Sequence, residues 1–252
     1  MTTRTTPIRL TLSTLLLLAA ASGAAQERPA ADRLLKDADR ARGGLATGIT
    51  WTATVNATGD DASTSRTFLV KARGDDALVE ALAPPRNKGE ILLFNDRTIW
   101  FVKPGLRRPV SISARQRLHG DAANGDIAST NYARDYEGTI VGEETVAGQP
   151  VWKLELKARG RNVTYDRIRY WISKKGHLGV KAEFLTVGGD VFKTATFEYG
   201  NRARTPAGEF EFVSRMTITD ATGAGTVTTI SFGPPRVETH PPSMFNINNV
   251  VR

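Results

Sequence analysis

The chain has 252 residues, no cysteine and a formal net charge of +8. The lack of cysteine excludes disulfide bonds, thiolate metal sites and a cysteine nucleophile. After the N-terminal apolar run, no stretch approaches the roughly 18 apolar residues that a membrane-spanning helix needs, so the sequence predicts no transmembrane segment there.

Residues 1–25 have the features of a secretory signal peptide. Two arginines precede the short apolar run Leu10–Ala21, and small residues follow it. This order predicts cleavage after Ala24 or Ala25. Because no cysteine stands at the cleavage site for acylation, we expect a soluble periplasmic protein of a bacterial envelope, without a lipid anchor.

Cleavage would remove Arg4 and Arg9 and no acidic residue, which leaves a net charge of +6 on residues 26–252. Such a basic surface can meet anionic lipid headgroups or an acidic partner, or it can simply keep the protein in solution. Nucleic acid is disfavoured as a partner, because the protein is expected outside the cytoplasm and lacks a motif of basic and stacking aromatic residues. Composition shows no break within 26–252, so one domain is expected.

The first elements are a helix and a series of strands. Apolar residues recur with helical spacing over Pro29–Leu45, and Gly43-Gly44 is expected to end that helix. From Ile49 the apolar period changes to two, which predicts strands. Further alternating segments lie around Phe68–Ala72 and Leu78–Leu82.

The stretch from Pro84 to Asn131 contains the strongest local signal. Two apolar runs, Ile91–Phe94 and Ile99–Val102, flank the polar turn Asn95-Asp96-Arg97, which predicts a β-hairpin over Glu90–Lys103.

The long polar connection Ser111–Asp135 follows the hairpin. It is rich in Gly, Asp and Asn, which favours a mobile lid over a catalytic loop. We expect short helical turns at Ala114–Leu118 and Ile127–Tyr132, the second capped by Asp126.

Strands resume after this connection at regular spacing, with turns marked by glycine. Such a series predicts an antiparallel sheet that curls into a sandwich or barrel. The tail 234–252 is rich in Pro and Asn, with Met244, Phe245 and Ile247 as expected docking points. The remaining predicted strands are Gly138–Glu143, Val151–Ala158, Arg167–Ser173, Val180–Thr186, Val191–Tyr199, Met216–Asp220 and Thr226–Phe232.

The sequence contains little that could carry catalysis or bind a metal. His119, His177 and His240 share no metal-ligand spacing, and neither a G-x-S-x-G elbow nor an S-x-x-K motif occurs. We therefore expect no enzyme activity, no metal and no cofactor.

Large apolar side chains on the strands are the remaining candidates for function. They can form an ordinary core, or they can line the concave face of a curled sheet that takes up acyl chains, which needs apolar area and no special residue. The candidates for a cavity or its lid are Trp51, Val55, Phe68, Val70, Leu92, Phe94, Trp100, Val102, Trp152, Leu154, Tyr170 and Phe184.

Trp100 is the most specific of these candidates. Its strand, Thr98–Lys103, is apolar at both parities, with Ile99 and Phe101 on one face and Trp100 and Val102 on the other. In a strand with one solvated face, apolar and polar residues would alternate. Both faces of this strand are therefore expected to be covered. We therefore expect Trp100 at the rim or floor of the cavity.

Several of these motifs, in this order and spacing, resemble those of LolA-like outer membrane lipoprotein-sorting proteins. The resemblance covers roughly Thr50 to Tyr199 and departs from the family pattern at Asp96-Arg97, Val102 and Ser173. No position is assigned to the family's lid-contacting arginine. The motifs are the hairpin Asn95–Pro104, the preceding Phe68–Lys71 and Leu78–Leu82, the pair Lys88-Gly89 after Pro85, the turn Gly125–Ala128, and the strands with Tyr170–Lys174 and Lys181–Phe184.

The resemblance implies a half-open antiparallel β-barrel whose helices form a lid over an apolar concave face. It also implies a monomeric periplasmic carrier for acyl chains of a lipoprotein or lipid, with a membrane-protein donor and acceptor. Two alternatives stay open: an accessory protein of an envelope exporter that carries no ligand, and an enzyme acting on lipids or glycans.

Overall fold

The computed structural model describes residues 29–58, 63–95, 97–128, 131–223 and 225–250. The predicted signal peptide and Asp96 of the predicted hairpin lie outside these residues. The described chain is mainly β, with one large antiparallel sheet of 14 strands, an N-terminal helix and a few short helices. In the part of the chain that is described, no helix has the length and apolarity needed to cross a membrane.

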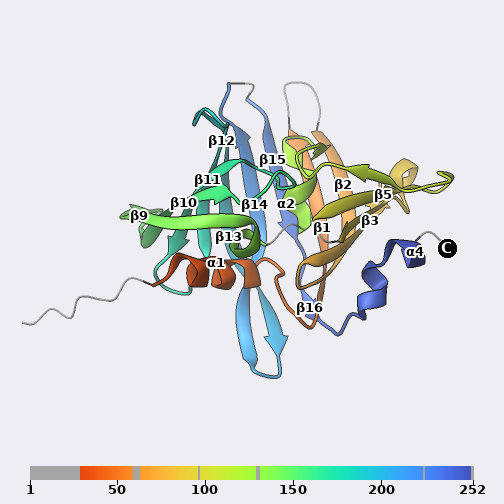
Figure 1. Cartoon of the computed structure of the whole chain (residues 1–252), viewed down its shortest axis with the longest axis horizontal. Helices are drawn as coiled ribbons and strands as arrows, with labels where there is room; N and C mark the ends of the chain where they lie inside the picture. Colours follow the sequence, from red (N-terminus) through yellow and green to blue (C-terminus); the bar gives the residue numbers. More distant parts are fainter. Residues whose placement is uncertain (1–28, 59–62, 96, 129–130, 224, 251–252) are drawn as a thin grey trace, which may run out of the picture.

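The large sheet consists of two runs of sequential antiparallel neighbours. Strands β1 to β6 form one run and β9 to β15 the other, and the pairing of β1 with β15 joins them (Figure 1). Strand β16 also pairs with β1, while β7 and β8 form a separate small sheet. The strands are β1 (Ile49–Thr58), β2 (Ser63–Arg73), β3 (Asp76–Ala83), β4 (Ile91–Asn95), β5 (Thr98–Val102), β6 (Val110–Ile112), β7 (Arg117–His119), β8 (Ala122–Ala123), β9 (Tyr136–Val146), β10 (Gln149–Ala158), β11 (Arg167–Ser173), β12 (Gly179–Leu185), β13 (Val191–Thr205), β14 (Gly208–Asp220), β15 (Val227–Phe232) and β16 (Arg236–Val237).

The helices lie along one side of this sheet and at the C-terminal end of the chain. In Figure 1, α1 runs beside the strands β9 to β13, and α2 lies between the two halves of the sheet. The C-terminal helices follow β16. The helical segments are α1 (Ala31–Arg40), η1 (Pro85–Asn87), α2 (Asn124–Ala128), α3 (Tyr132–Asp135), η2 (Pro242–Phe245) and α4 (Ile247–Val250), where η denotes a single turn of 3₁₀-helix.

Each predicted strand corresponds to an observed one, but the short strands β6, β7, β8 and β16 were not predicted, and one hairpin is longer than expected. Strands β13 and β14 continue to Thr205 and from Gly208, well beyond the predicted ends, and pair there through Asn201↔Phe212 and Arg204↔Glu209. This outer part of the hairpin is rich in charged residues, so it lacks the apolar alternation that marks a half-buried strand.

Three helical predictions require correction. The N-terminal helix ends at Arg40, not at Leu45, and Gly43 already has a positive φ of 115°. Ala114–Leu118 contains a turn followed by β7, because Arg117 pairs with Ala123 in the small sheet. The next helix begins at Asn124, so Asp126 lies inside its first turn instead of capping it.

Candidate functional site

The apolar residues of both halves of the sheet face the same interior. On β1, Trp51, Ala53 and Val55 are buried while Thr52 between them is exposed. The register places Val55 opposite Ile230 of β15. One continuous cluster of buried side chains extends from these strands to β3 and β4 on one side and to β10 and β11 on the other. The concave face is therefore apolar along its whole width.

Side chains from α1 and from the connecting segment, residues 111–135, cover this face. Leu34 and Leu35 of α1 and Ile127 of α2 are fully buried in the cluster, and Leu118 of β7 is buried there with 8% exposure. The half nearest α1 is filled by aromatic rings that contact one another, such as Tyr165 stacked on Phe184 with ring centroids 3.8 Å apart.

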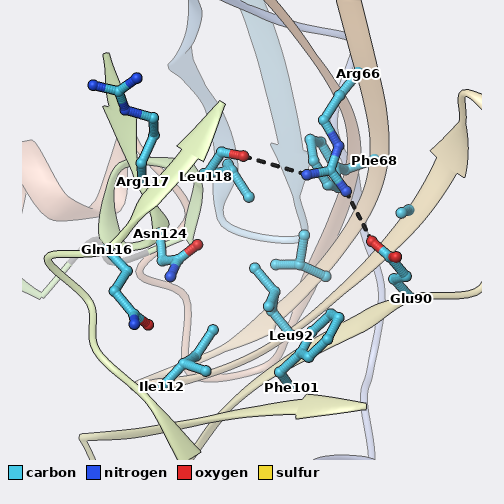
Figure 2. Close-up of a pocket in the computed structure, with 12 residues that line it drawn as sticks. Arg66, Phe68, Glu90, Leu92, Phe101, Ile112, Gln116, Arg117, Leu118 and Asn124 are labelled. Atoms are coloured by element: carbon cyan, nitrogen blue, oxygen red, sulfur yellow. Dashed lines mark hydrogen bonds and ion pairs between the residues drawn. The ribbon is translucent and has the colours of Figure 1, made fainter. Parts of the chain in front are cut away.

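A cavity of about 430 Å³ remains between the connecting segment and strands β2 to β5 (Figure 2). Phe68, Val79, Leu92 and Phe101 form its apolar floor. The register explains this grouping, because Leu92 of β4 lies opposite both Val79 and Phe101. The volume lies at the lower end of the range for sites that hold one small organic ligand.

Arg66 of β2 connects the sheet to the connecting segment at one end of this cavity. Its Nη1 donates a hydrogen bond to the carbonyl of Leu118 at 3.3 Å, and its Nη2 lies 3.0 Å from Oε2 of Glu90 (Figure 2). Its guanidinium also stands 5.1 Å from the centre of the Phe68 ring. Sequence analysis did not single out Arg66, because its two partners lie 24 and 52 residues away.

Glu90 is the acidic centre of this polar end. Burial acts to raise the pKa of its carboxyl, but hydrogen bonds from Lys103 and Asn87 and the charges of Lys103 and Arg66 outweigh that effect and hold the pKa below its ordinary value. The Lys103 Nζ lies 3.0 Å from Oε1. Glu90 therefore stays ionised and compensates two cations beside an apolar cavity.

Asp126 fixes the other end of the connecting segment. Its carboxylate accepts hydrogen bonds from the Ala123 N–H at 2.8 Å and from the Tyr165 hydroxyl at 2.8 and 3.0 Å. Burial raises the pKa of this carboxyl. The neighbouring Gly125 leaves no room for a Cβ atom, which would overlap the side chain of Thr164. This close approach gives a physical reason for glycine in the motif Gly125–Ala128.

Asp39 makes a corresponding contact between α1 and α3. Its Oδ2 accepts a hydrogen bond from the Ala133 N–H at 2.9 Å. Burial raises the pKa of Asp39 to about 7, although N–H groups of Ala133 and Tyr132 and the charge of Arg42 favour the ionised form.

The twelve predicted candidates divide between the two faces of the sheet. Phe68 and Leu92 line the cavity itself. Trp100 and Val102 alternate with the cavity-lining Phe101 along β5, so they lie on the opposite face, and neither belongs to the interior cluster. The other candidates belong to the buried cluster of the concave face: Trp51, Val55, Val70, Phe94, Trp152, Leu154, Tyr170 and Phe184.

The cavity offers apolar area with charged groups at one end, which suits an amphipathic ligand. The described residues contain no group of three or more His, Asp or Glu side chains that could hold a metal ion. The three histidines lie apart, and each has a hydrogen-bond partner on another element: His119 with Thr64, His177 with Asp37, and His240 with Thr50.

Several solved structures share this fold. A LolA superfamily protein from Nitrosomonas europaea is 25% identical, with a TM-score of 0.78 over 88% of this chain and 99% of that one. An outer membrane lipoprotein-sorting protein domain from Vibrio parahaemolyticus is 22% identical, with a TM-score of 0.74 over 88% and 100%. A DUF1329 family protein from Desulfovibrio piger is 18% identical, with a TM-score of 0.71 over 87% and 97%.

No curated protein matches the sequence. A family model described as "-like: Uncharacterized protein" matches residues 73–252, which is more than half of the chain. The structural matches confirm the resemblance and the predicted fold class. The chain belongs to the family of this model, and its fold is that of the LolA superfamily and of outer membrane lipoprotein-sorting protein domains.

Proposed function

We propose that the protein is a periplasmic carrier that shields an acyl chain of a lipoprotein or lipid and moves it toward the outer membrane. The observation that carries this proposal is the cavity of about 430 Å³ between the connecting segment and strands β2 to β5. Its floor is apolar, as an acyl chain requires, and burial of that chain needs no catalytic group.

The connecting segment is proposed to act as the lid. Two side-chain hydrogen bonds are recorded between β2 and the segment at this end of the cavity within the described residues: Arg66 donates to the Leu118 carbonyl, and Thr64 bonds to His119. Breaking two bonds of this kind costs about 1–3 kcal/mol, so these bonds alone do not hold the segment closed. A carrier must admit and release its ligand, and hydrogen bonds of this strength would permit both.

Export by the predicted signal peptide is part of the proposal. We expect the mature protein to begin at Ala25 or Gln26. N-terminal sequencing of protein from the periplasmic fraction checks this prediction. An uncleaved product that sediments with membranes would contradict it.

Substitution on β5 tests which face binds the acyl chain. Phe101→Ala removes a ring from the cavity floor and is expected to weaken binding of a dansyl-labelled fatty acid by about tenfold. Trp100→Ala is the matched control, because the Trp100 side chain lies on the face of β5 opposite to Phe101. Its affinity for the probe should stay within about twofold of that of the unmodified protein. Fluorescence titration measures both, and circular dichroism verifies that each variant is folded.

The opposite result has a definite meaning. If Trp100→Ala weakens binding and Phe101→Ala does not, the ligand lies against the other face of β5, and the cavity is not the binding site. If the unmodified protein does not bind the probe at all, the carrier proposal fails.

A second candidate is an accessory protein of an envelope exporter that carries no ligand. It is favoured by the half of the concave face nearest α1, where the protein's own rings fill the interior. Native mass spectrometry of protein purified from the periplasm distinguishes the two. A co-purifying lipid supports the carrier, and a ligand-free protein bound to an envelope protein supports the accessory.

A further inference from the structure

The positive charge of the chain is concentrated in one segment. Between Arg86 and Arg117 there are eight Lys or Arg residues and only two Asp or Glu residues, a net charge of +6. The whole chain has a net charge of +8, and the signal peptide contributes two further arginines. The remaining residues are therefore neutral in sum. From Arg97 to Arg117 there is no acidic residue.

Acidic partners neutralise only some of these cations. Arg97 pairs with Asp135, Lys103 with Glu90, and Arg115 with Asp166. Across the described residues, no ion pair is recorded for the exposed cations Arg86, Lys88, Arg107, Arg108 and Arg117. Their charge is directed to the solvent.

The segments that carry these cations meet beside the cavity. Glu90, which follows η1 and lines the cavity, forms an ion pair with Lys103 at the start of the β5–β6 loop, residues 103–109, and Arg117 also lines the cavity. In Figure 1 the β5–β6 loop projects beyond the rest of the sheet at the right. We call this loop, together with Arg86, Lys88 and Val110, the basic lip.

The basic lip also exposes apolar side chains. Leu106 at the loop tip is 46% exposed and Val110 at the start of β6 is 49% exposed. Arg107 and Arg108 lie between these two residues in the sequence. Exposed apolar residues interleaved with cations suit the boundary between lipid headgroups and acyl chains, where apolar groups are buried and cations meet phosphates. An acidic protein would provide a counterpart for the charge but would not by itself explain the exposed leucine on a projecting loop.

We propose that the basic lip docks this protein onto the surface of a membrane rich in anionic phospholipid, with Leu106 entering the headgroup layer and Arg107 and Arg108 contacting phosphates. Docking would bring the polar end of the cavity, with Arg66 and Glu90, toward the membrane, because Glu90 is paired with Lys103 of the basic lip. This inference concerns a surface and not the cavity, so it can hold or fail independently of acyl-chain binding.

Co-sedimentation with vesicles tests the proposal. The exported protein should bind vesicles of phosphatidylcholine with about one third phosphatidylglycerol much better than vesicles of pure phosphatidylcholine, and high salt should weaken that binding. The double variant Arg107→Gln/Arg108→Gln should reduce the partition coefficient by about thirtyfold, since each cation near an anionic surface contributes a factor of about five. Leu106→Ser should reduce it severalfold, including at high salt.

The matched control is Arg33→Gln/Lys36→Gln, which removes the same charge from the exposed face of α1. This variant should bind vesicles almost as well as the unmodified protein. Equal loss in both double variants, or equal binding to neutral and anionic vesicles, would overturn the proposal. Binding of the dansyl-labelled fatty acid should be unchanged in Arg107→Gln/Arg108→Gln, so that failure of docking and failure of the carrier proposal can be told apart.

Discussion

Replacing Phe245 by alanine is expected to lower the free energy of unfolding by about 3–5 kcal/mol, the usual cost of removing a fully buried phenyl ring. Phe245 belongs to η2 near the end of the chain and is only 1% exposed. Its ring packs edge-on against His240, with centroids 6.3 Å apart. His240 in turn makes a hydrogen bond of 2.9 Å with Thr50 of β1.

This tail packs on the outer side of the sheet, because η2 contacts β3 and β4. Loss of the ring should therefore expose apolar residues on that side, such as the fully buried Leu93. Urea unfolding followed by tryptophan fluorescence measures the change. Met244→Ala is the control in the same turn, since Met244 is only partly buried, and it should cost much less. Equal effects of both substitutions would show that the tail does not stabilise the sheet through Phe245.

Replacing Asp39 by asparagine is expected to change how stability depends on pH. Burial raises the pKa of Asp39 from 3.8 to about 7 in the folded protein. Between these values the folded protein binds a proton that the unfolded chain does not bind. The contribution of this proton to the free energy of unfolding is therefore complete below about pH 4 and disappears as the pH rises toward 7.

This pKa difference corresponds to a change of at most about 4 kcal/mol in the free energy of unfolding between about pH 4 and pH 7. Asparagine cannot ionise and keeps an oxygen that can accept the Ala133 N–H. The variant should therefore lose less stability than the unmodified protein as the pH rises, and the difference should level off above about pH 8. The groups that also act on this carboxyl are Arg42 and Asp135, which remain in the variant.

Unfolding in urea at several pH values from 4 to about 8.5 measures this difference. The matched control is Asp32→Asn on the same helix, whose side chain is 62% exposed. Its profile should run parallel to that of the unmodified protein. If the Asp39→Asn profile is also parallel, Asp39 titrates as an ordinary carboxyl, and the contact between α1 and α3 has no pH dependence.

The sequence by itself determined where most strands lie. The apolar period of two holds along β1, and the short turn after Asn95 joins β4 to β5, so local chemistry identifies both. The buried cluster of the concave face was also accessible from the sequence, since most candidates for the cavity belong to it. Binding by these residues stays a prediction.

Only the tertiary structure decided which face of β5 borders the cavity. Both parities of Thr98–Val102 are apolar, so alternation could not assign Phe101 or Trp100 to the interior. The outer side of the neighbouring strands β3 and β4 is covered by the C-terminal η2, about 150 residues further along the chain. No local sequence pattern in β3, β4 or β5 indicates that a segment so distant in the chain will cover them.

The contact between Arg66 and Leu118 also became visible only in the tertiary structure. An arginine on a strand is usually a solvated residue, and nothing near Arg66 in the sequence shows that a carbonyl 52 residues later will meet its guanidinium. Periodicity and turn chemistry act between near neighbours and therefore predict elements. The cavity and its polar end arise from contacts between distant segments, and these depend on how the sheet curls.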